Sequence, residues 1–366
     1  TAVSGCTQPA ACAGCAVAAQ CPGVPASYLA AHGVRDLRPL AERPDDLYAQ
    51  RTTPLRVWDE RGRAAARQAR LLVLRPTVHC NQDCGFCSAN ETTPNVWADP
   101  ARMVREIARA ARRGVERVSF SGGEPTLARE LPTYVAVARR AGVPKIELVT
   151  NGVLLDRRAR VDALVAAGLT HAFVSLHGHD EASASAATRK VGDFARTIAA
   201  IGHLVDAGVI TVVNHVIHAG NVGFLAQFVD ELHARFGGRV MISFAFVTPQ
   251  YKALAHLALV PRLADVAPQL QAACWRALAL GQPFVIGSRQ GVPPCFLGPF
   301  VAWSDLMQLA HEAQAEDAPQ KQQGPRCGAC RFAAYCTGLW KPYAAREGFA
   351  ELVPVPGAPL GADERA

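Results

Sequence analysis

The spacing of its cysteines constrains this chain more than any other feature of its sequence. Twelve cysteines occur among 366 residues, and all but Cys274 fall into three closely spaced groups. A disulfide-stapled secreted fold fits poorly, because a chain of this length with 50% hydrophobic residues can bury a core without such bonds. Closely spaced thiolates instead suit a metal ion or cluster. We therefore predict metal ligation by the three groups, while Cys274, in a predicted helix over 263–280, reads as a buried apolar residue. The groups are Cys6, Cys12, Cys15 and Cys21; Cys80, Cys84 and Cys87; and Cys295, Cys327, Cys330 and Cys336.

Composition argues against several classes of protein. No apolar run approaches the ~18 residues that a membrane span needs, and residues 1–6 do not resemble a secretory signal. We therefore expect no membrane span and a cytoplasmic location. The net charge of +7 arises from 38 basic and 31 acidic residues scattered along the chain. Because the basic residues are not clustered with aromatic ones, nucleic acid is not favoured as a partner.

The central cysteine group lies on a predicted loop. Residues 71–74 are a short apolar run typical of a buried strand, and Cys80, Cys84 and Cys87 follow it. A Cys-x3-Cys-x2-Cys loop can place three sulfurs on three irons of a cubane and leave the fourth iron without a protein ligand. That iron could bind a substrate or cofactor directly, as the open position of a catalytic zinc does. The alternative is a structural zinc site completed by His79.

A glycine pair ends the next predicted strand, over 115–120, and a carboxylate follows it. The segment reads Gly122, Gly123, Glu124, Pro125. Glycines allow a backbone to approach a ligand closely, with its N–H groups exposed. The segment lacks the Lys-Ser/Thr pair of a phosphate loop, and its carboxylate would repel phosphate. It therefore suits a ligand with a positively charged amine, and an ordinary turn is the alternative.

Together, the three cysteines and the Gly-Gly-Glu-Pro segment resemble those of the radical S-adenosylmethionine (SAM) superfamily, over roughly residues 68–250. The resemblance implies that Cys80, Cys84 and Cys87 hold a [4Fe–4S] cluster whose open iron is chelated by the amino and carboxyl groups of SAM. It also implies that the glycine–glycine–glutamate segment contacts the SAM amine. An electron from the reduced cluster would then break a carbon–sulfur bond of SAM. The usual products are methionine and a 5′-deoxyadenosyl radical, which abstracts hydrogen.

Helical and strand patterns alternate through the middle of the chain, and Asp99 is placed to cap the first of these helices. About six strand–helix units predict a parallel sheet with right-handed crossovers, and hence an α/β fold of the partial (β/α)6 TIM-type barrel class. The predicted helices are 99–114, 131–141, 157–167, 193–207 and 223–236, and the later strands are 145–150, 170–176, 209–216 and 239–247.

Ligands of parallel α/β sheets bind at the carboxyl ends of the strands, so polar residues there are candidates. Asn151, Ser175 and Asn214 occupy such positions. Similar positions face SAM in the molybdopterin-precursor cyclase group, and this resemblance makes the three residues candidate SAM contacts, with turn or cap residues as the alternative. Four histidines near these strand ends are candidates for substrate or proton contacts or for structural roles: His177, His179, His215 and His218.

The C-terminal cysteine group resembles the auxiliary cluster domain of many radical SAM enzymes, called SPASM in its two-cluster form and twitch in its shortened form. The Cys-x2-Cys-x5-Cys run from Cys327 to Cys336 matches, but the later Cys-x3-Cys of the second cluster is absent. The resemblance implies one four-cysteine cluster that includes Cys295. A zinc ribbon is the alternative.

The N-terminal cysteine group repeats this pattern. Residues 12–23 align without gaps with residues 327–338, and three cysteines, two central alanines and a final glycine coincide. We therefore predict a second auxiliary cluster held by Cys12, Cys15 and Cys21, with Cys6 as the fourth ligand. The alternatives are an unligated leader and a zinc knot.

These assignments divide the chain into three predicted units. Residues 1–66 form an N-terminal auxiliary-cluster segment and a linker with a possible strand at 55–58, residues 67–255 form the barrel, and residues 256–366 form a C-terminal helix and auxiliary cluster domain. Within the last unit, residues 305–326 are expected to be largely helical.

Three classes of function fit these predictions. The first is a radical SAM enzyme that abstracts hydrogen from a peptide or small-molecule substrate, with one radical SAM cluster and two auxiliary [4Fe–4S] clusters that relay electrons or bind substrate. It would need a reducing partner such as flavodoxin or ferredoxin. The second is a radical SAM alkyl or methyl transferase, and the third is an iron–sulfur electron carrier. The incomplete triad argues against a carrier, which usually ligates every iron.

Overall fold

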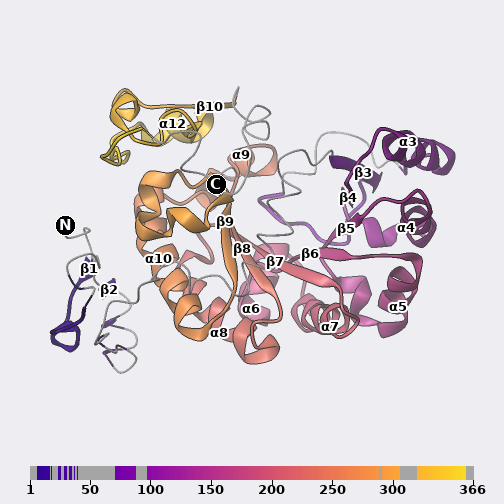
Figure 1. The fold of residues 1–366 in the computed structure, drawn as a ribbon, viewed down its shortest axis with the longest axis horizontal. Coiled ribbons are helices and arrows are strands. Elements are labelled where there is room, and N and C mark those ends of the chain that lie inside the picture. The colour runs from indigo at the N-terminus through magenta and orange to yellow at the C-terminus, as the bar shows by residue number, and fades with distance from the viewer. Residues whose placement is uncertain are drawn as a thin grey trace.

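The centre of the molecule is a seven-stranded, all-parallel sheet whose strand order follows the chain order (Figure 1). This computed structural model describes residues 71–87, 97–287, 291–305 and 320–359, together with 6–16, 18, 24–25, 29–30, 33–34, 37 and 39. The strands of the sheet are β3 (Leu71–Thr77), β4 (Arg117–Gly122), β5 (Lys145–Thr150), β6 (His171–Ser175), β7 (Ile210–Ile217), β8 (Met241–Phe246) and β9 (Phe284–Gly287).

Helices connect successive strands and lie around the outside of the sheet in Figure 1. The connecting helices are α3 (Pro100–Arg112), α4 (Leu131–Arg140), α5 (Arg158–Ala167), α6 (Glu181–Thr188), α7 (Asp193–Asp206), α8 (Leu225–Phe236), α9 (Lys252–Ala255) and α10 (Leu263–Leu280). Short 3₁₀ helices include η3 (Pro125–Leu127), η4 (Val153–Asp156), η7 (Pro294–Phe296), η8 (Gly298–Trp303) and η11 (Cys327–Ala329).

The predicted partial barrel is confirmed, with one strand added. Each strand from β3 to β8 is followed by helix and pairs in parallel with the next strand, which gives six strand–helix units. The sequence analysis missed β9, because four residues that read Phe-Val-Ile-Gly are too short to show a period. The sheet therefore continues beyond residue 255, into the segment that was assigned to the C-terminal unit.

Local sequence explains why these elements form. The Asp99 carboxylate accepts a hydrogen bond from the Arg102 N–H at 2.6 Å and so caps α3, whose Met103 and Ile107 side chains are buried. Buried and half-buried residues alternate along β5, whereas every residue of β8 is buried, as expected of a strand covered on both faces. Strand β3 continues through Pro76, which an edge strand tolerates because it has a neighbour on one side only.

Two other predictions need correction or lie outside the description. Helix α6 was not predicted, although Asp180 and Ser183 form a capping box at its start. The described end of the predicted 305–326 helix is instead the short strand β10 (Lys321–Gln322), which pairs antiparallel with β11 (Leu339–Trp340). The predicted strand 55–58 lies outside the described residues.

The C-terminal part of the chain packs on the last strand. The Phe284 ring stacks on Trp303 with centroids 5.7 Å apart, and α10 packs beside η7 and η8. Strands β10 and β11 and helix α12 (Lys341–Glu347) then form a small unit at the upper left of Figure 1. The short N-terminal strands β1 (Cys6–Thr7) and β2 (Val24–Pro25) pair with each other, and β2 lies against α10.

The end of β4 lies directly against the backbone that leads into the central cysteine loop. The N–H groups of Gly123 and Glu124 donate to the carbonyl oxygens of Thr77 (3.0 Å) and His79 (2.6 Å). A Cβ atom at Gly123 would overlap the His79 carbonyl, and one at Gly122, where φ is +128°, would overlap that of Thr77. The two glycines are therefore needed for this close approach, which fixes where the cysteine loop begins.

We predict that Gly123→Ala lowers the free energy of unfolding by about 1–3 kcal/mol, because the added methyl group must push residues 77–79 away. Chemical denaturation measures the loss. The control is Gly223→Ala, since a Cβ at Gly223 would meet nothing within 4 Å and this glycine has no positive φ. Equal stability of the two variants would contradict the proposed role of the contact.

Candidate functional site

The three cysteines of the central group line one cavity at the carboxyl end of β3. The cavity has a volume of about 410 Å³, within the range of small-molecule sites. Cys80 is exposed, and Cys84 and Cys87 are half-buried. Gly123, at the end of β4, also lines the cavity. The structure thus brings together the triad and one residue of the Gly-Gly-Glu-Pro segment.

The environment of these thiols favours a bound cation. Burial raises the pKa of Cys84 to about 12, and the neighbouring Cys87 and Cys80 raise it further. Burial also raises the pKa of Cys80, against the hydrogen bond that the Gln82 N–H donates to its sulfur at 3.4 Å. Three neighbouring thiolates would repel one another in this setting, whereas a coordinated metal centre removes the cost by binding them. The donor set therefore fits a thiolate-ligated cluster.

Glu124 is buried behind this cavity, with 1% of its surface exposed. One carboxylate oxygen accepts hydrogen bonds from the Thr126 N–H (3.0 Å), the Thr126 hydroxyl (2.6 Å) and the Thr150 hydroxyl (2.7 Å). The other accepts from the Asn151 N–H at 2.7 Å. Burial raises the pKa of Glu124, and these four bonds oppose the rise. The predicted contact with an amine stays a prediction, and what the geometry gives Glu124 is a hold on the end of β5.

Asn151 links that strand end to the cysteine loop. Its side-chain amide donates to the Asn81 side-chain oxygen at 2.7 Å and lies 3.8 Å from the Cys80 sulfur. Asn151 is itself held by Glu124 through its backbone N–H. A continuous set of hydrogen bonds therefore connects the Gly-Gly-Glu-Pro segment, the end of β5 and the first cysteine.

The other predicted SAM contacts do not line the triad cavity. Pro125 is buried as the first residue of η3. Ser175 and Asn214 are paired in register at the ends of β6 and β7. The Asn214 side-chain oxygen is buried, and no hydrogen-bond partner for it is found among the described residues. Their roles as SAM contacts therefore remain predictions.

Three of the four candidate histidines pack below the cysteine loop as neutral rings. The Phe86 ring, from that loop, lies 4.9 Å from His177 and 5.0 Å from His218, measured between centroids. Burial lowers the pKa of His215 to about 3 and that of His218 to about 4. The His177 Nδ1 atom accepts a hydrogen bond from the Val216 N–H at 3.1 Å. These contacts favour the structural alternative, which predicted histidine positions alone could not separate from a proton-transfer role.

Two lysines on the cavity wall were missed by the sequence analysis. Lys190 and Lys252 line the cavity with the cysteines. The Lys252 ammonium pairs with Asp83 of the cysteine loop at 2.6 Å, and Arg189 pairs with the same carboxylate at 3.3 Å. Lysines carry no spacing motif, and they reach the cavity only because the segments after α6 and β8 meet the loop there. They place positive charge beside a site for negatively charged thiolates.

The C-terminal cysteines converge in the same way. Cys295, from η7, and the three cysteines of residues 327–336 line one cavity whose wall is otherwise mostly apolar, including Phe332 and Leu352. Burial raises the pKa of Cys295 to about 12, and the three other thiols raise it further. Backbone N–H groups donate to three of the sulfurs: Gly324 to Cys327 (3.3 Å), Gly338 to Cys336 (3.4 Å) and Val355 to Cys330 (3.4 Å). Such N–H···S bonds are typical around cluster thiolates.

The N-terminal cysteine group is described only in part. Cys12 and Cys15 are half-buried free thiols, whereas the Cys6 side chain and Cys21 lie outside the description. In Figure 1 this segment lies at the far left, apart from both the triad loop and the C-terminal unit. Ligation of a cluster by these four cysteines therefore stays a prediction.

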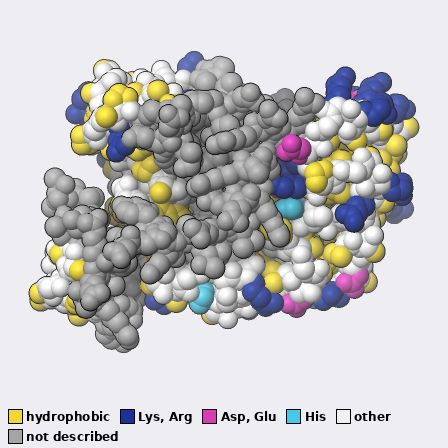
Figure 2. Space-filling model, viewed as in Figure 1, with side chains coloured by type: hydrophobic (Ala, Val, Ile, Leu, Met, Phe, Trp, Pro, Cys, Tyr) yellow, Lys and Arg dark blue, Asp and Glu magenta, His cyan; other side chains and the backbone are white. Residues whose placement is uncertain are grey.

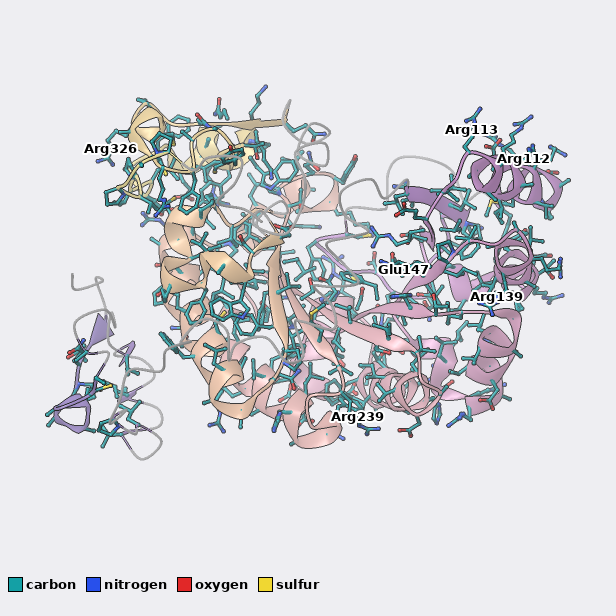
Figure 3. The ribbon with its side chains drawn as sticks, viewed as in Figure 1. Arg112, Arg113, Arg139, Glu147, Arg239 and Arg326 are labelled. Carbon is teal, nitrogen blue, oxygen red and sulfur yellow. The ribbon has the colours of Figure 1, made fainter. Side chains whose placement is uncertain are left out.

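Basic side chains gather over the outer helices, at the upper right of Figure 2. Figure 3 shows Arg112 and Arg113 at the end of α3 and Arg139 near the end of α4, all at the outer edge of the molecule. Trp97, just before α3, pairs with Thr77 at the triad end of β3, so the last turn of α3 lies at the opposite end. Cations there favour the helix C-termini. None of the helices in the described part of the chain has the length and hydrophobicity of a membrane span.

Comparison with known proteins agrees with this site. Residues 74–222 match the family model of the radical SAM superfamily. The chain is 33% identical to the PqqA peptide cyclase of Gluconobacter oxydans over 174 residues, which is 47% of this chain and 48% of that protein. It is 40% identical to the GTP 3′,8-cyclase of Mycobacterium marinum over 130 residues, 34% of this chain and 36% of that protein. The chain thus matches about half or less of the length of these relatives.

Solved structures show a similar fold. The structure named native anSMEcpe with bound AdoMet has a TM-score of 0.54 at 14% identity, covering 78% of this chain and 92% of that one. SuiB of Streptococcus suis bound to S-adenosylmethionine has a TM-score of 0.50 at 20% identity, covering 60% of this chain and 50% of that one. The matched domain contains the cysteine triad, the Gly-Gly-Glu-Pro segment and five of the seven strands. The chain is a member of the radical SAM superfamily.

Proposed function

We propose that this chain cleaves SAM reductively at a [4Fe–4S] cluster held by Cys80, Cys84 and Cys87, and so starts radical chemistry on a second substrate. The observation that carries the proposal is that these three cysteines, and no fourth, line one cavity of the described structure. Three protein ligands leave one iron of a cubane open to SAM. The bound cluster supplies one electron, the C5′–S bond of SAM breaks, and methionine and a 5′-deoxyadenosyl radical result. The radical takes a hydrogen atom from the substrate and becomes 5′-deoxyadenosine.

The protein residues around the cavity hold the reactants in place. Asn151 donates toward Cys80 and fixes the start of the triad, while Glu124 holds Asn151 and Thr150. Lys252 and Arg189 fix Asp83, and with it the middle of the loop. Lys190 and Lys252 also place positive charge on the cavity wall, which suits the carboxylate of SAM. These contacts orient the site and need no proton transfer.

We further propose one auxiliary [4Fe–4S] cluster at Cys295, Cys327, Cys330 and Cys336. Support comes from the convergence of all four thiols on one mostly apolar cavity and from the three N–H···S bonds. Four ligands leave no open iron there, so electron relay is favoured over substrate binding. A second auxiliary cluster at the N-terminal cysteines rests on the internal sequence match alone.

A peptide is the substrate class that we propose, with a small molecule as the alternative. PqqA peptide cyclase, the relative with 33% identity, supports the peptide, whereas the GTP cyclases support the small molecule. We expect a flavodoxin or ferredoxin as the reducing partner, in the cytoplasm. Transfer of part of SAM to the product would appear as a shortfall of 5′-deoxyadenosine relative to methionine, and a pure electron carrier would form neither.

We predict that Cys84→Ala abolishes 5′-deoxyadenosine formation from SAM under dithionite, because the cluster loses one of its three ligands. Iron bound by the C-terminal group should remain. Anaerobic reconstitution, iron analysis and chromatography of the products measure both effects. Cys274→Ala is the matched control, since Cys274 is buried in α10 and far in sequence from the cysteine groups. Normal product formation by Cys84→Ala would exclude the proposed cleavage site.

Glu124→Gln should weaken SAM binding about ten- to a hundredfold, since loss of the charged acceptor costs about 1.5–3 kcal/mol and loosens the end of β5. Equilibrium binding of SAM to the reconstituted protein measures the change, with iron content determined in parallel. Glu130→Gln is the control, because the exposed Glu130 precedes α4 without making a side-chain cap bond. If both variants bind SAM as the parent does, Glu124 has no role in the SAM site.

Replacing Cys12 and Cys15 together by serine should lower the iron content from ~12 to ~8 atoms per chain, at four irons per cluster. Metal analysis after reconstitution measures iron and zinc together. An unchanged iron content would show that the N-terminal cysteines hold no cluster, and a loss of zinc would make the segment a zinc-bound structural unit.

A further inference from the structure

Lys321 is a buried cation next to the C-terminal cysteine group. Only 5% of its surface is exposed, and its ammonium lies 4.5 Å from the centroid of the Trp340 ring. A charged side chain removed from water is costly unless other charges or π faces compensate it. The aromatic ring offers part of that compensation. Its position suggests where the rest comes from.

The strand that carries Lys321 is fixed against the cysteine loop. Strand β10 pairs with β11, so that Lys321 is opposite Trp340, four residues after Cys336. A Cβ atom at Gly338 would overlap the Gln322 carbonyl, which shows how closely β10 passes the Cys336 turn. Gln323 then donates from its side chain to the Cys336 carbonyl at 2.6 Å and to the Ala333 carbonyl at 2.7 Å.

The charge of Lys321 acts on the Cys336 sulfur. Burial raises the pKa of the Cys336 thiol to about 11, and the Gly338 N–H and the Lys321 ammonium both oppose this rise by favouring the thiolate. The nearby carboxylates are committed elsewhere: Glu347 pairs with Arg346 at 2.6 Å, and Glu351 pairs with Arg262 at 2.6 Å. Charge around the cysteines is therefore dominated by cations.

We propose that Lys321 tunes the C-terminal centre by favouring its reduced state. Four thiolates and a +2 core give a net charge of about −2, and reduction adds one more negative charge. A fixed positive charge in a medium of low dielectric constant stabilises the added electron more than it would in water. Lys321 is thus a positioning residue for charge and does not ligate iron. The inference rests on the proposed auxiliary cluster at these four cysteines.

The test uses the full-length chain with Cys12, Cys15, Cys80, Cys84 and Cys87 replaced by alanine, so that the C-terminal group holds the remaining iron. Iron content is measured first. The midpoint potential is then measured by titration monitored by electron paramagnetic resonance (EPR). Lys321→Met should make reduction about tenfold less favourable, which lowers the midpoint potential by about 59 mV for a one-electron couple. Lys321→Arg, which keeps the charge, should restore most of the parent value.

Lys341→Met is the matched control, because Lys341 is exposed at the start of α12 and follows Trp340 directly. It should leave the midpoint potential unchanged. If Lys321→Met loses iron, Lys321→Gln is titrated in its place. Retained iron with equal potentials in the Lys321 and Lys341 variants would overturn the role of Lys321. Absence of iron from the parent background would instead overturn the auxiliary cluster itself, and the inference with it.

Discussion

A close backbone contact between the end of β4 and residues 77–79 determines the geometry of the whole site. Two successive glycines allow this contact, and two N–H groups at the end of β4 are used to hold it. The cysteine loop starts at the next residue, so its position relative to the sheet follows from the contact. Glu124 then binds the end of β5, and Asn151 reaches back to the first cysteine. Three neighbouring strands are thereby connected to one loop.

Electrostatics connect this site to the C-terminal unit. In both places burial raises the pKa of cysteine thiols, to about 12 for Cys84 and Cys295, so that free thiolates are disfavoured. Both places also hold cations: Lys190 and Lys252 line the triad cavity, and Lys321 acts on Cys336. Sites of this kind favour thiolates bound to metal over either free thiols or free thiolates. The difference is that the triad cavity is large, whereas the C-terminal cavity is enclosed mostly by apolar side chains.

Much of this could be predicted from the sequence, since spacing and periodicity are local properties. The parallel sheet, the Asp99 cap, the helix 263–280 and the grouping of the triad all follow from such patterns. Strand β9 was missed because it is short, and Lys190 and Lys252 were missed because only the fold brings them to the cavity. For Glu124 the segment was recognised, but the four bonds that bury its carboxylate depend on Thr150 and Asn151, which are distant in sequence.

The central claim is that the triad leaves one iron open to SAM. It is tested most directly by EPR spectroscopy of the anaerobically reconstituted and reduced protein, recorded with and without SAM. We predict that SAM changes the signal of one cluster only, and that the change is absent from the Cys84→Ala variant while the remaining signal persists. Identical spectra of the parent protein with and without SAM, at a SAM concentration far above that of the protein, would contradict the account.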